Sequence, residues 1–402
     1  MTTRRIFLTA AAAAIAATAS GAVARAEETI KIGEINSYTR LPAFTQPYRN
    51  GWELAVEEIN TAGGVLGRKI EVISRDDNGK APDAVKIAEE LVSRDGVVML
   101  AGTFFSHIGL AVTDFAQQKE VMFVAAEPLS DALTWAKGNR YTFRLRPNTT
   151  MQAAMLAEQA AKLPARRWAT IAPNYKYGQD AVAAFKAELL KRKPDVEFVG
   201  EQWPALFKID AGAEAQALAN MNPEAIYNVT FGGDLAKFVR EGKLRGLFEG
   251  REVVSLLSGE PEYLDALKDE APAGWIVTGY PWYAIDTPEH RAFVNAYRAR
   301  FNDYPRLGSV VGYNTFKAIA AIIAKAGSTD TDKMIAAAEG ITVDSPTGPF
   351  TFRAIDHQAT MGAYVGRTAV KDGKGIMVDW FYADGADYMP GDEEITRMRA
   401  GN

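Results

Sequence analysis

Three short segments that follow apolar runs contain the residues best suited to binding chemistry. The first, Gly102 to Ser106, joins the apolar run 97–101 to a helix that we expect over about residues 106–119. Ligands bind at the carboxyl edge of open parallel sheets, and the free N–H groups of a helix N-terminus attract a carboxylate. Ser106 adds a hydroxyl donor, so this segment indicates a carboxylate site. The same hydroxyl also suits an N-cap, and the two roles are compatible.

The other two segments occupy equivalent positions after later strands. Residues 174–179 contain Tyr177, whose hydroxyl can donate a hydrogen bond, and residues 258–262 contain Glu260, whose carboxylate can accept one from a cationic amine. Aromatic side chains also fall in loops at strand ends. Each alone is typical of core packing, but their shared topological position makes them candidate pocket walls. They are Phe44, Phe231, Tyr280 and Trp282.

Motifs for catalysis and metal binding are missing from the chain. There is no G-x-S-x-G, Walker A or H-E-x-x-H pattern, and no G-x-G-x-x-G between a strand and a helix. His107, His290 and His357 lie far apart, and none has a metal-ligand partner three or four residues later. Asp76 and Asp77 are adjacent on a strand, so their side chains point to opposite faces. We therefore expect no catalytic residue, no metal and no cofactor, and an enzyme on this frame would lack a nucleophile–base pair.

The first 26 residues have the pattern of an export signal. Residues 3–8 (TRRIFL) look like a twin-arginine motif, an Ala-rich apolar stretch follows, and Ala24-Arg25-Ala26 supplies a cleavage site. The mature chain would then carry 42 basic and 50 acidic residues, a net charge of −8, which argues against binding to nucleic acid or anionic membranes. The absence of cysteine excludes disulfides and a lipid anchor. We expect a soluble periplasmic protein that begins near Glu27.

Strand-like and helix-like segments alternate along the rest of the chain. This βαβ order favours parallel sheets covered by helices on both faces, and the length suggests two domains. The first predicted strands are 30–35, 69–74, 97–101 and 121–125. After Pro147 the pattern restarts, with strands at 168–172, 196–201, 225–229 and 253–257, helices at 288–301 and 310–326, and antiparallel strands at 350–352 and within 362–381.

These segments, in this order, resemble the leucine/isoleucine/valine-binding protein family of type I periplasmic solute receptors for ABC importers. The resemblance covers nearly the whole mature chain. Each motif is weak evidence alone, but the motifs occur in the family's order and at suitable spacing, which makes the resemblance specific. The motifs are Asn50-Gly51 through Glu57-Glu58-Ile59-Asn60, Gly63 to Arg68, Asp76-Asp77, Phe143 to Pro147, Tyr175 to Gly178, Tyr313-Asn314-Thr315, Ala326 to Asp330 and Ser345 to Phe350.

The resemblance implies two Rossmann-like lobes joined by three crossover strands, with the ligand in the cleft between them. We expect residues 27–147 plus 279–350 in lobe 1, and residues 148–278 plus 351–402 in lobe 2. No low-complexity linker separates the lobes, which suits a molecule whose lobes are joined by several crossing strands.

The resemblance also implies roles for individual residues. Ser106 matches the family serine that binds the ligand carboxylate, while Glu127 and Leu129 stand where backbone groups and a threonine hydroxyl usually help. Tyr177 matches a second-lobe tyrosine, and Glu260 matches the acid that binds an amino group.

The chain also departs from the family pattern. Leu129 cannot donate the threonine hydrogen bond, Glu127 places an acid near the carboxylate site, and Phe231 lacks the hydroxyl of the family tyrosine. Phe104 and Phe105 make the pocket more aromatic. The full expected ligand-binding set is Ser106, Glu127, Leu129, Tyr177, Glu260, Phe44, Phe104, Phe105, Phe231, Tyr280 and Trp282.

The implied function is that of the periplasmic solute-binding component of an ABC importer, which closes on its ligand by hinge motion without chemistry. Glu260 favours an amino acid (branched-chain or related) or an amide, and the aromatic lining leaves an aromatic or other small carboxylate open. A ligand sensor for a membrane signalling partner is the alternative class. The implied partners are membrane permease and ATPase subunits, and we expect a monomer.

Overall fold

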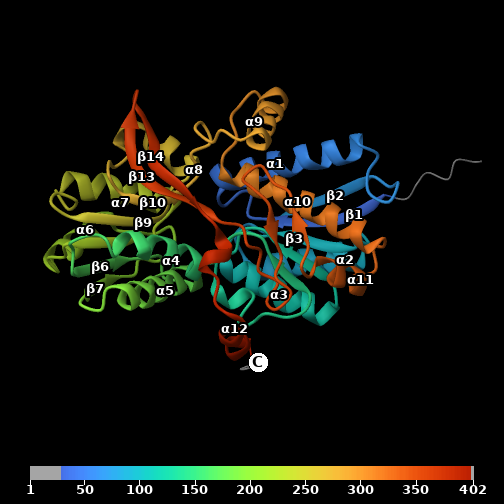
Figure 1. The fold of residues 1–402 in the computed structure, drawn as a ribbon, viewed down its shortest axis with the longest axis horizontal. Helices are drawn as coiled ribbons and strands as arrows, with labels where there is room; N and C mark the ends of the chain where they lie inside the picture. Colours follow the sequence, from blue (N-terminus) through green and yellow to red (C-terminus); the bar gives the residue numbers. More distant parts are fainter. Residues whose placement is uncertain (1–28, 400–402) are drawn as a thin grey trace, which may run out of the picture.

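The structure is a computed structural model that describes residues 29–399, so the expected export signal at residues 1–26 lies outside the described residues. Two lobes lie side by side, and the chain crosses between them (Figure 1). Each lobe is built on one parallel or mainly parallel sheet with helices around it. This is the two-lobed α/β architecture that the strand–helix alternation predicts.

The first lobe contains a five-stranded parallel sheet in the order β2-β1-β3-β4-β5. β3 and β4 are buried along their whole length, as continuous apolar runs in a parallel sheet require. The strands are β1 (Ile30–Asn36), β2 (Ile70–Asp76), β3 (Met99–Gly102), β4 (Met122–Ala125) and β5 (Thr142–Arg144). The helices before β5 are α1 (Pro42–Thr61), α2 (Ala81–Ser93), α3 (Ser106–Lys119) and the 3-10 helix η1 (Asp131–Leu133).

The second lobe contains a seven-stranded sheet in the order β14-β13-β10-β9-β8-β6-β7, in which β13 runs antiparallel to both of its neighbours, β10 and β14, and the other pairs are parallel. Its strands are β6 (Arg167–Ile171), β7 (Glu197–Gln202), β8 (Ala225–Asn228), β9 (Glu252–Gly259), β10 (Ile276–Gly279), β13 (Ala363–Lys371) and β14 (Lys374–Ala383). Its helices are α4 (Thr149–Ala160), α5 (Lys176–Arg192), α6 (Ala211–Asn220), α7 (Gly232–Leu244), α8 (Pro261–Leu267) and η2 (Lys268–Glu270).

Later segments return to the first lobe. They are α9 (Pro288–Phe301), α10 (Leu307–Ala326), α11 (Thr331–Ala338) and the short strands β11 (Thr342–Val343) and β12 (Phe350–Thr351). α10 packs against α1. By length and mean hydropathy (1.4) α10 could cross a membrane, but 78% of this stretch is buried, so in this fold it is a core helix.

The expected assignment of residues 351–402 to lobe 2 needs correction. Of this segment, only β13 and β14 join the second sheet. Gln358, beyond the expected boundary, forms an isolated parallel bridge with Arg144 of β5, and Arg144 Nε donates to Gln358 Oε1 at 2.5 Å. An isolated bridge leaves no periodic pattern in the sequence, so hydrophobicity alone could not assign this segment.

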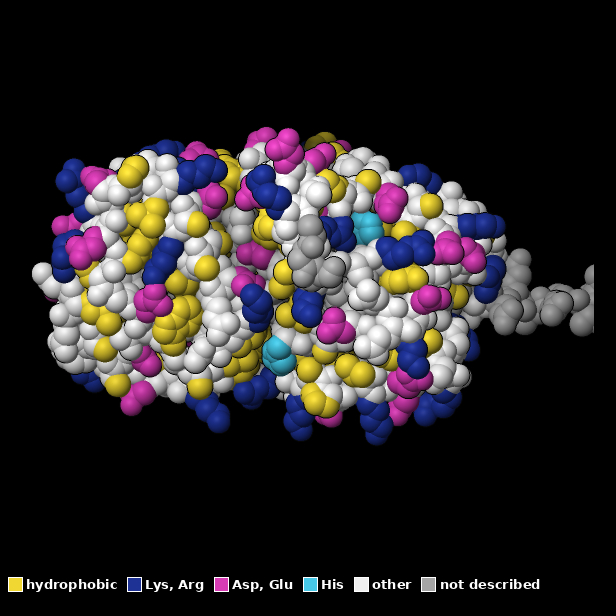
Figure 2. Space-filling model, turned by 90° about the horizontal axis from the view of Figure 1, so that it is seen from below, with side chains coloured by type: hydrophobic (Ala, Val, Ile, Leu, Met, Phe, Trp, Pro, Cys, Tyr) yellow, Lys and Arg dark blue, Asp and Glu magenta, His cyan; other side chains and the backbone are white. Residues whose placement is uncertain are grey.

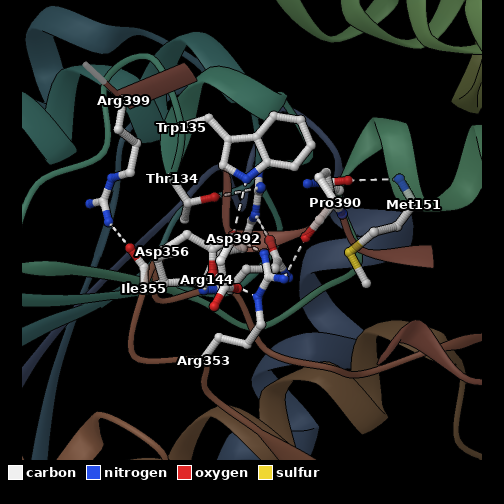
Figure 3. Close-up of polar contacts among 12 residues, drawn as sticks. Thr134, Trp135, Arg144, Met151, Arg353, Ile355, Asp356, Pro390, Asp392 and Arg399 are labelled. Carbon is white, nitrogen blue, oxygen red and sulfur yellow. Dashed lines mark hydrogen bonds and ion pairs between the residues drawn. The ribbon is translucent and has the colours of Figure 1, made fainter. Parts of the chain in front are cut away.

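The chain also returns to the first lobe after β14. η3 (Gly385–Tyr388) ends at Tyr388, which donates to Glu158 of α4 at 2.8 Å. Arg353 then donates to the carbonyl of Pro390 at 2.9 Å, and Arg399 of α12 (Asp392–Arg399) donates to the carbonyl of Ile355 (Figure 3). The C-terminal segment thus contacts both lobes, in addition to the crossovers that follow β5, follow β10 and precede β13.

Candidate ligand-binding site

A cavity lies between the two lobes at the carboxyl ends of their strands. The first lobe contributes side chains from segments after β3, β4 and β5, and the second from segments after β6 and β8 and from β9 itself. This is the edge where parallel α/β sheets bind ligands. The lining residues are Phe104, Ser106, Glu127, Leu129, Arg146, Tyr175, Tyr177, Phe231 and Leu257.

Ser106 is the first residue of α3 and is 2% exposed. Its Oγ accepts a hydrogen bond from the backbone N–H of Ser130 at 3.1 Å. Phe105 occupies the N-cap position and no side chain caps the helix, so the expected capping role of Ser106 is wrong. A hydroxyl beside a helix N-terminus nevertheless favours a carboxylate.

The backbone that leads to Ser106 is strained. Thr103 has a φ of 62°, in the left-handed region that a side chain disfavours, and Leu257 on the opposite wall has a φ of 68°. Such strain persists only where surrounding packing imposes it, and it concentrates at ligand sites. Thr103 follows β3 and Leu257 lies near the end of β9, so both residues stand at the strand ends beside the cavity.

Arg146 lies between two buried glutamates from different lobes. Its Nη1 is 3.1 Å from Glu127 Oε2, and its Nη2 is 2.7 Å from Glu260 Oε1. The three side chains are 4%, 0% and 1% exposed. Glu127 follows β4, Glu260 immediately precedes α8, and Arg146 lies on the crossover after β5. We call this group the Glu127–Arg146–Glu260 triad.

The triad leaves two carboxylate oxygens without a hydrogen-bond partner among the described residues, Glu127 Oε1 and Glu260 Oε2. Burial raises the pKa of Glu127 to about 8 and that of Glu260 to about 7, against the lowering effect of Arg146 on both. Burial acts to lower the pKa of Arg146, but the two carboxylates outweigh it and raise that pKa. The guanidinium therefore stays charged, and a proton can leave the acids when a cation approaches.

Aromatic rings from both lobes meet around the cavity. The ring centroid of Phe104 lies 5.1 Å from that of Phe44, 5.0 Å from Phe105 and 6.2 Å from Phe231 of the second lobe. Tyr177 packs edge-on against Phe231 at 5.7 Å, and its buried hydroxyl has no partner among the described residues. Of these contacts, the one between Phe104 and Phe231 joins the two lobes.

The structure brings most, but not all, of the expected site residues together. Glu260 does not line the cavity and reaches it through Arg146. Phe44 and Phe105 support the ring of Phe104 from outside the lining. The expected residues that line the cavity are Phe104, Ser106, Glu127, Leu129, Tyr177 and Phe231.

Tyr280 and Trp282 are corrections to the expected set, because neither lines this cavity. The hydroxyl of Tyr280 is 2.6 Å from His290 Nε2, and Trp282 stacks on Tyr304 at 4.7 Å. Both residues follow a strand, as expected, but the chain there leaves for the crossover to α9 and carries their rings away from the cleft.

Three lining residues, Arg146, Tyr175 and Leu257, were absent from the expected set. Arg146 had a usable signal, since it is a charged residue between a strand and Pro147, where the second lobe begins. Its pairing with two acids depends on tertiary structure. Within residues 29–399, no group of three or more His, Asp or Glu side chains could hold a metal ion.

Two α/β lobes closed around a small, partly aromatic cavity define a bilobal ligand-binding protein. The sequence profile of the periplasmic binding proteins matches residues 29–374, and this chain belongs to that family. Members of the family are known as substrate-binding proteins of transporters.

The comparison with individual proteins supports this assignment. The leucine-, isoleucine-, valine-, threonine- and alanine-binding protein of Pseudomonas aeruginosa is 28% identical over 364 residues, which cover 87% of this chain and 92% of that protein. An ABC-type branched-chain amino acid transporter structure from Rhodopseudomonas palustris is 28% identical with a TM-score of 0.72, covering 90% of this chain and 98% of the other. An ABC transporter solute-binding protein of the same species, solved with 3,4-dihydroxybenzoic acid, is 25% identical with a TM-score of 0.79, covering 89% and 98%.

Proposed function

We propose that this chain is the solute-binding component of an ABC importer and that it closes around an amino acid, branched-chain or related. The single observation that carries the ligand class is the combination of a carboxylate-binding group, Ser106, and an unpaired buried acid oxygen, Glu127 Oε1, in one cavity. A zwitterion satisfies both groups at once. The apolar side chain would contact the aromatic rings around Phe104 and Phe231.

Closure of the two lobes performs this function without covalent chemistry. Ser106 and Glu127 belong to the first lobe, while Tyr177 and Phe231 belong to the second, so a bound ligand contacts both. Water is excluded as the lobes close, and charge-assisted hydrogen bonds strengthen in the desolvated cleft. Ligand binding and closure therefore stabilise each other.

A small aromatic carboxylate is the second candidate, because one observation favours it. Four aromatic side chains line the cavity, Phe104, Tyr175, Tyr177 and Phe231, and aromatic ligands pack well on such walls. One relative at 25% identity was solved with 3,4-dihydroxybenzoic acid. In this case Ser106 would bind the carboxylate, and the triad would not bind an amino group of the ligand.

A thermal-shift screen followed by calorimetry separates the two ligand classes. Binding at 100 times Kd adds about 2.7 kcal/mol to stability, which is easily measured. We expect branched-chain amino acids to raise the melting temperature and their des-amino analogues to have a smaller effect. If only benzoates raise the melting temperature, the ligand is an aromatic carboxylate and not an amino acid.

We also propose that permease and ATPase subunits use this protein after export. The face in Figure 2 intersperses acidic and basic side chains without an extended basic patch, which suits a freely diffusing carrier better than a nucleic-acid or anionic-membrane protein. Deleting the gene should abolish high-affinity uptake of the ligand. Normal uptake together with a lost transcriptional response to the ligand would instead support the sensor role.

The twin-arginine route of export makes a separate prediction. Changing Arg4 and Arg5 together to lysine should leave the precursor in the cytoplasm, because the pathway reads the two guanidinium groups. Fractionation and immunoblotting measure this. Unchanged export would leave a general secretory signal as the explanation of residues 1–26.

A further inference from the structure

We propose that Arg146 is the specificity-determining residue of this site. It withdraws Glu260 from the ligand, so that Glu127 contacts the ligand's amino group and the summed charge of the Glu127–Arg146–Glu260 triad decides whether that group is required. The inference rests on the proposed amino acid function and assigns its amine-binding step.

Geometry places Arg146, and not Glu260, at the cavity wall. Arg146 and Glu127 both line the cavity, whereas Glu260 does not. The shorter of the two triad contacts, 2.7 Å, is the one that holds Glu260 against Arg146. A ligand ammonium in the cavity therefore meets Glu127 first, and Glu127 Oε1 has no hydrogen-bond partner among the described residues.

The charge of Arg146 is also outweighed by the two glutamates with which it pairs, which disfavours a ligand carboxylate. Both of its Nη atoms are engaged by glutamates, and its guanidinium carbon lies 5.6 Å from the centroid of the Phe44 ring. With both acids ionised, two negative charges surround one positive charge. The triad then attracts an ammonium and repels a carboxylate, and in a buried site this net charge is weakly screened.

The net charge of the triad predicts how each variant should bind an amino acid. This prediction differs from the one that direct contact between Glu260 and the amine would give. Replacing either glutamate by glutamine makes the triad neutral. Replacing Arg146 and Glu260 together removes one charge of each sign and leaves the net charge of −1 on Glu127. If Glu260 bound the amine itself, this double replacement would be as harmful as the loss of Glu260 alone.

The experiment measures Kd for leucine and for 4-methylpentanoate, which has the same skeleton without the amino group, by calorimetry at about pH 8.5. If the screen selects another amino acid, that ligand and its des-amino analogue replace the pair. The variants are Glu127→Gln, Glu260→Gln and the double variant Arg146→Met with Glu260→Gln. Glu34→Gln is the matched control, because Glu34 is equally buried and accepts from Ser74 Oγ at 2.6 Å rather than from Arg146.

We expect the preference for leucine to fall about 100-fold or more in each single triad variant, the scale of breaking a buried ion pair. It should stay within about threefold of wild type in the double variant and in Glu34→Gln. Circular dichroism verifies that each variant is folded. An unchanged preference in Glu127→Gln, or a lost preference in the double variant, overturns the inference. A wild-type protein that prefers 4-methylpentanoate overturns the proposed amino acid function, and the inference with it.

Discussion

Ser106→Ala removes two interactions, one with the ligand and one with the protein. We expect ligand binding to weaken by about 1.5–3 kcal/mol, the range for a hydrogen bond to a charged group. Because Ser106 Oγ accepts the N–H of Ser130 and caps no helix, the folding cost is that of an unsatisfied buried donor, about 1–3 kcal/mol. Calorimetry and urea unfolding separate the two effects. Unchanged affinity would move the carboxylate site away from α3.

The raised pKa of Glu127 predicts that ligand preference depends on pH. Glu127 faces Arg146 and Glu260 in the triad, with Glu262 near enough to raise its pKa further. Below about pH 8 Glu127 holds a proton in the empty site, so an ammonium must displace that proton to bind. Affinity for an amino acid should therefore rise with pH towards 8 and then level off, while affinity for a des-amino carboxylate should not rise.

Calorimetry in buffers of different ionisation enthalpy checks this directly, because amino acid binding at pH 7 should release a proton. Glu127→Gln should remove both the proton release and the rise with pH. Binding of wild type without proton release would mean that Glu127 stays protonated and donates to the ligand instead.

Much of the candidate site could be predicted from the sequence, because strand ends lie at one edge of a sheet. The ion pairs between its side chains could not be predicted. Ser106 and Tyr177 were found because both follow a strand at the carboxyl edge of a sheet. The same rule misplaced Trp282, since a position after a strand does not fix where a side chain points once the chain enters a crossover. Arg146 was missed because its role depends on two acids far away in the sequence.

The close approach of α1 and α10 predicts the effect of adding one methyl group. A Cβ at Gly312 would stand 2.0 Å from the carbonyl oxygen of Tyr48, so Gly312→Ala must push the helices apart. We expect a loss of about 1–3 kcal/mol in unfolding free energy, as in other overpacked cores. The matched control is Gly233→Ala in α7, where no atom lies within 4 Å. It should be neutral or stabilising by up to about 1 kcal/mol.

Urea unfolding of both variants tests this difference. Because α1 carries Phe44 and α10 begins beside Glu262, Gly312→Ala should also weaken ligand binding. Equal stability of the two variants would show that the helices separate easily, contrary to their tight packing.

At the scale of elements, long periodic segments could be predicted well, while some of the shortest elements could not. The sequence predicted helices at 106–119 and 288–301, and α3 and α9 have these bounds. The sequence also predicted a strand at 350–352, where β12 lies, but its partner β11 has two residues and the bridge of Gln358 to Arg144 is a single pair, too few for a periodic pattern. Thr342 of β11 pairs with Thr351 of β12 nearby in the sequence, whereas Gln358 and Arg144 come from distant parts of the chain, so the lobe boundary there is set by tertiary contacts.

At the scale of the molecule, the lobes are held together by contacts at the cavity and beyond it. Glu262 of α8 accepts the N–H of Gly308 at the start of α10 (2.7 Å), and Asp265 accepts from Arg306 (3.0 Å). On another side, Ser130 donates to Asp180 of α5. These contacts join groups of opposite lobes, so we expect that an opening of the cleft that separates these groups would have to break them.

Phe207 offers a test of closure that leaves the ligand's polar contacts intact. This second-lobe ring packs at 5.8 Å from Phe105, and the guanidinium of Arg40 lies 4.5 Å from its centroid, both partners belonging to the first lobe. Phe207→Ala should therefore destabilise the closed form by about 1–2.5 kcal/mol, the sum of one aromatic pair and one cation–π contact. Stopped-flow measurement should find dissociation about 5–70-fold faster and association little changed. Phe381→Ala is the control, since that ring lies 41% exposed on β14 of the same lobe.

Small-angle scattering should record a smaller ligand-induced contraction for Phe207→Ala than for wild type. If Phe207→Ala releases ligand at the wild-type rate, the lobes do not close through this contact, and the contacts of Asp265 and Asp180 must account for closure.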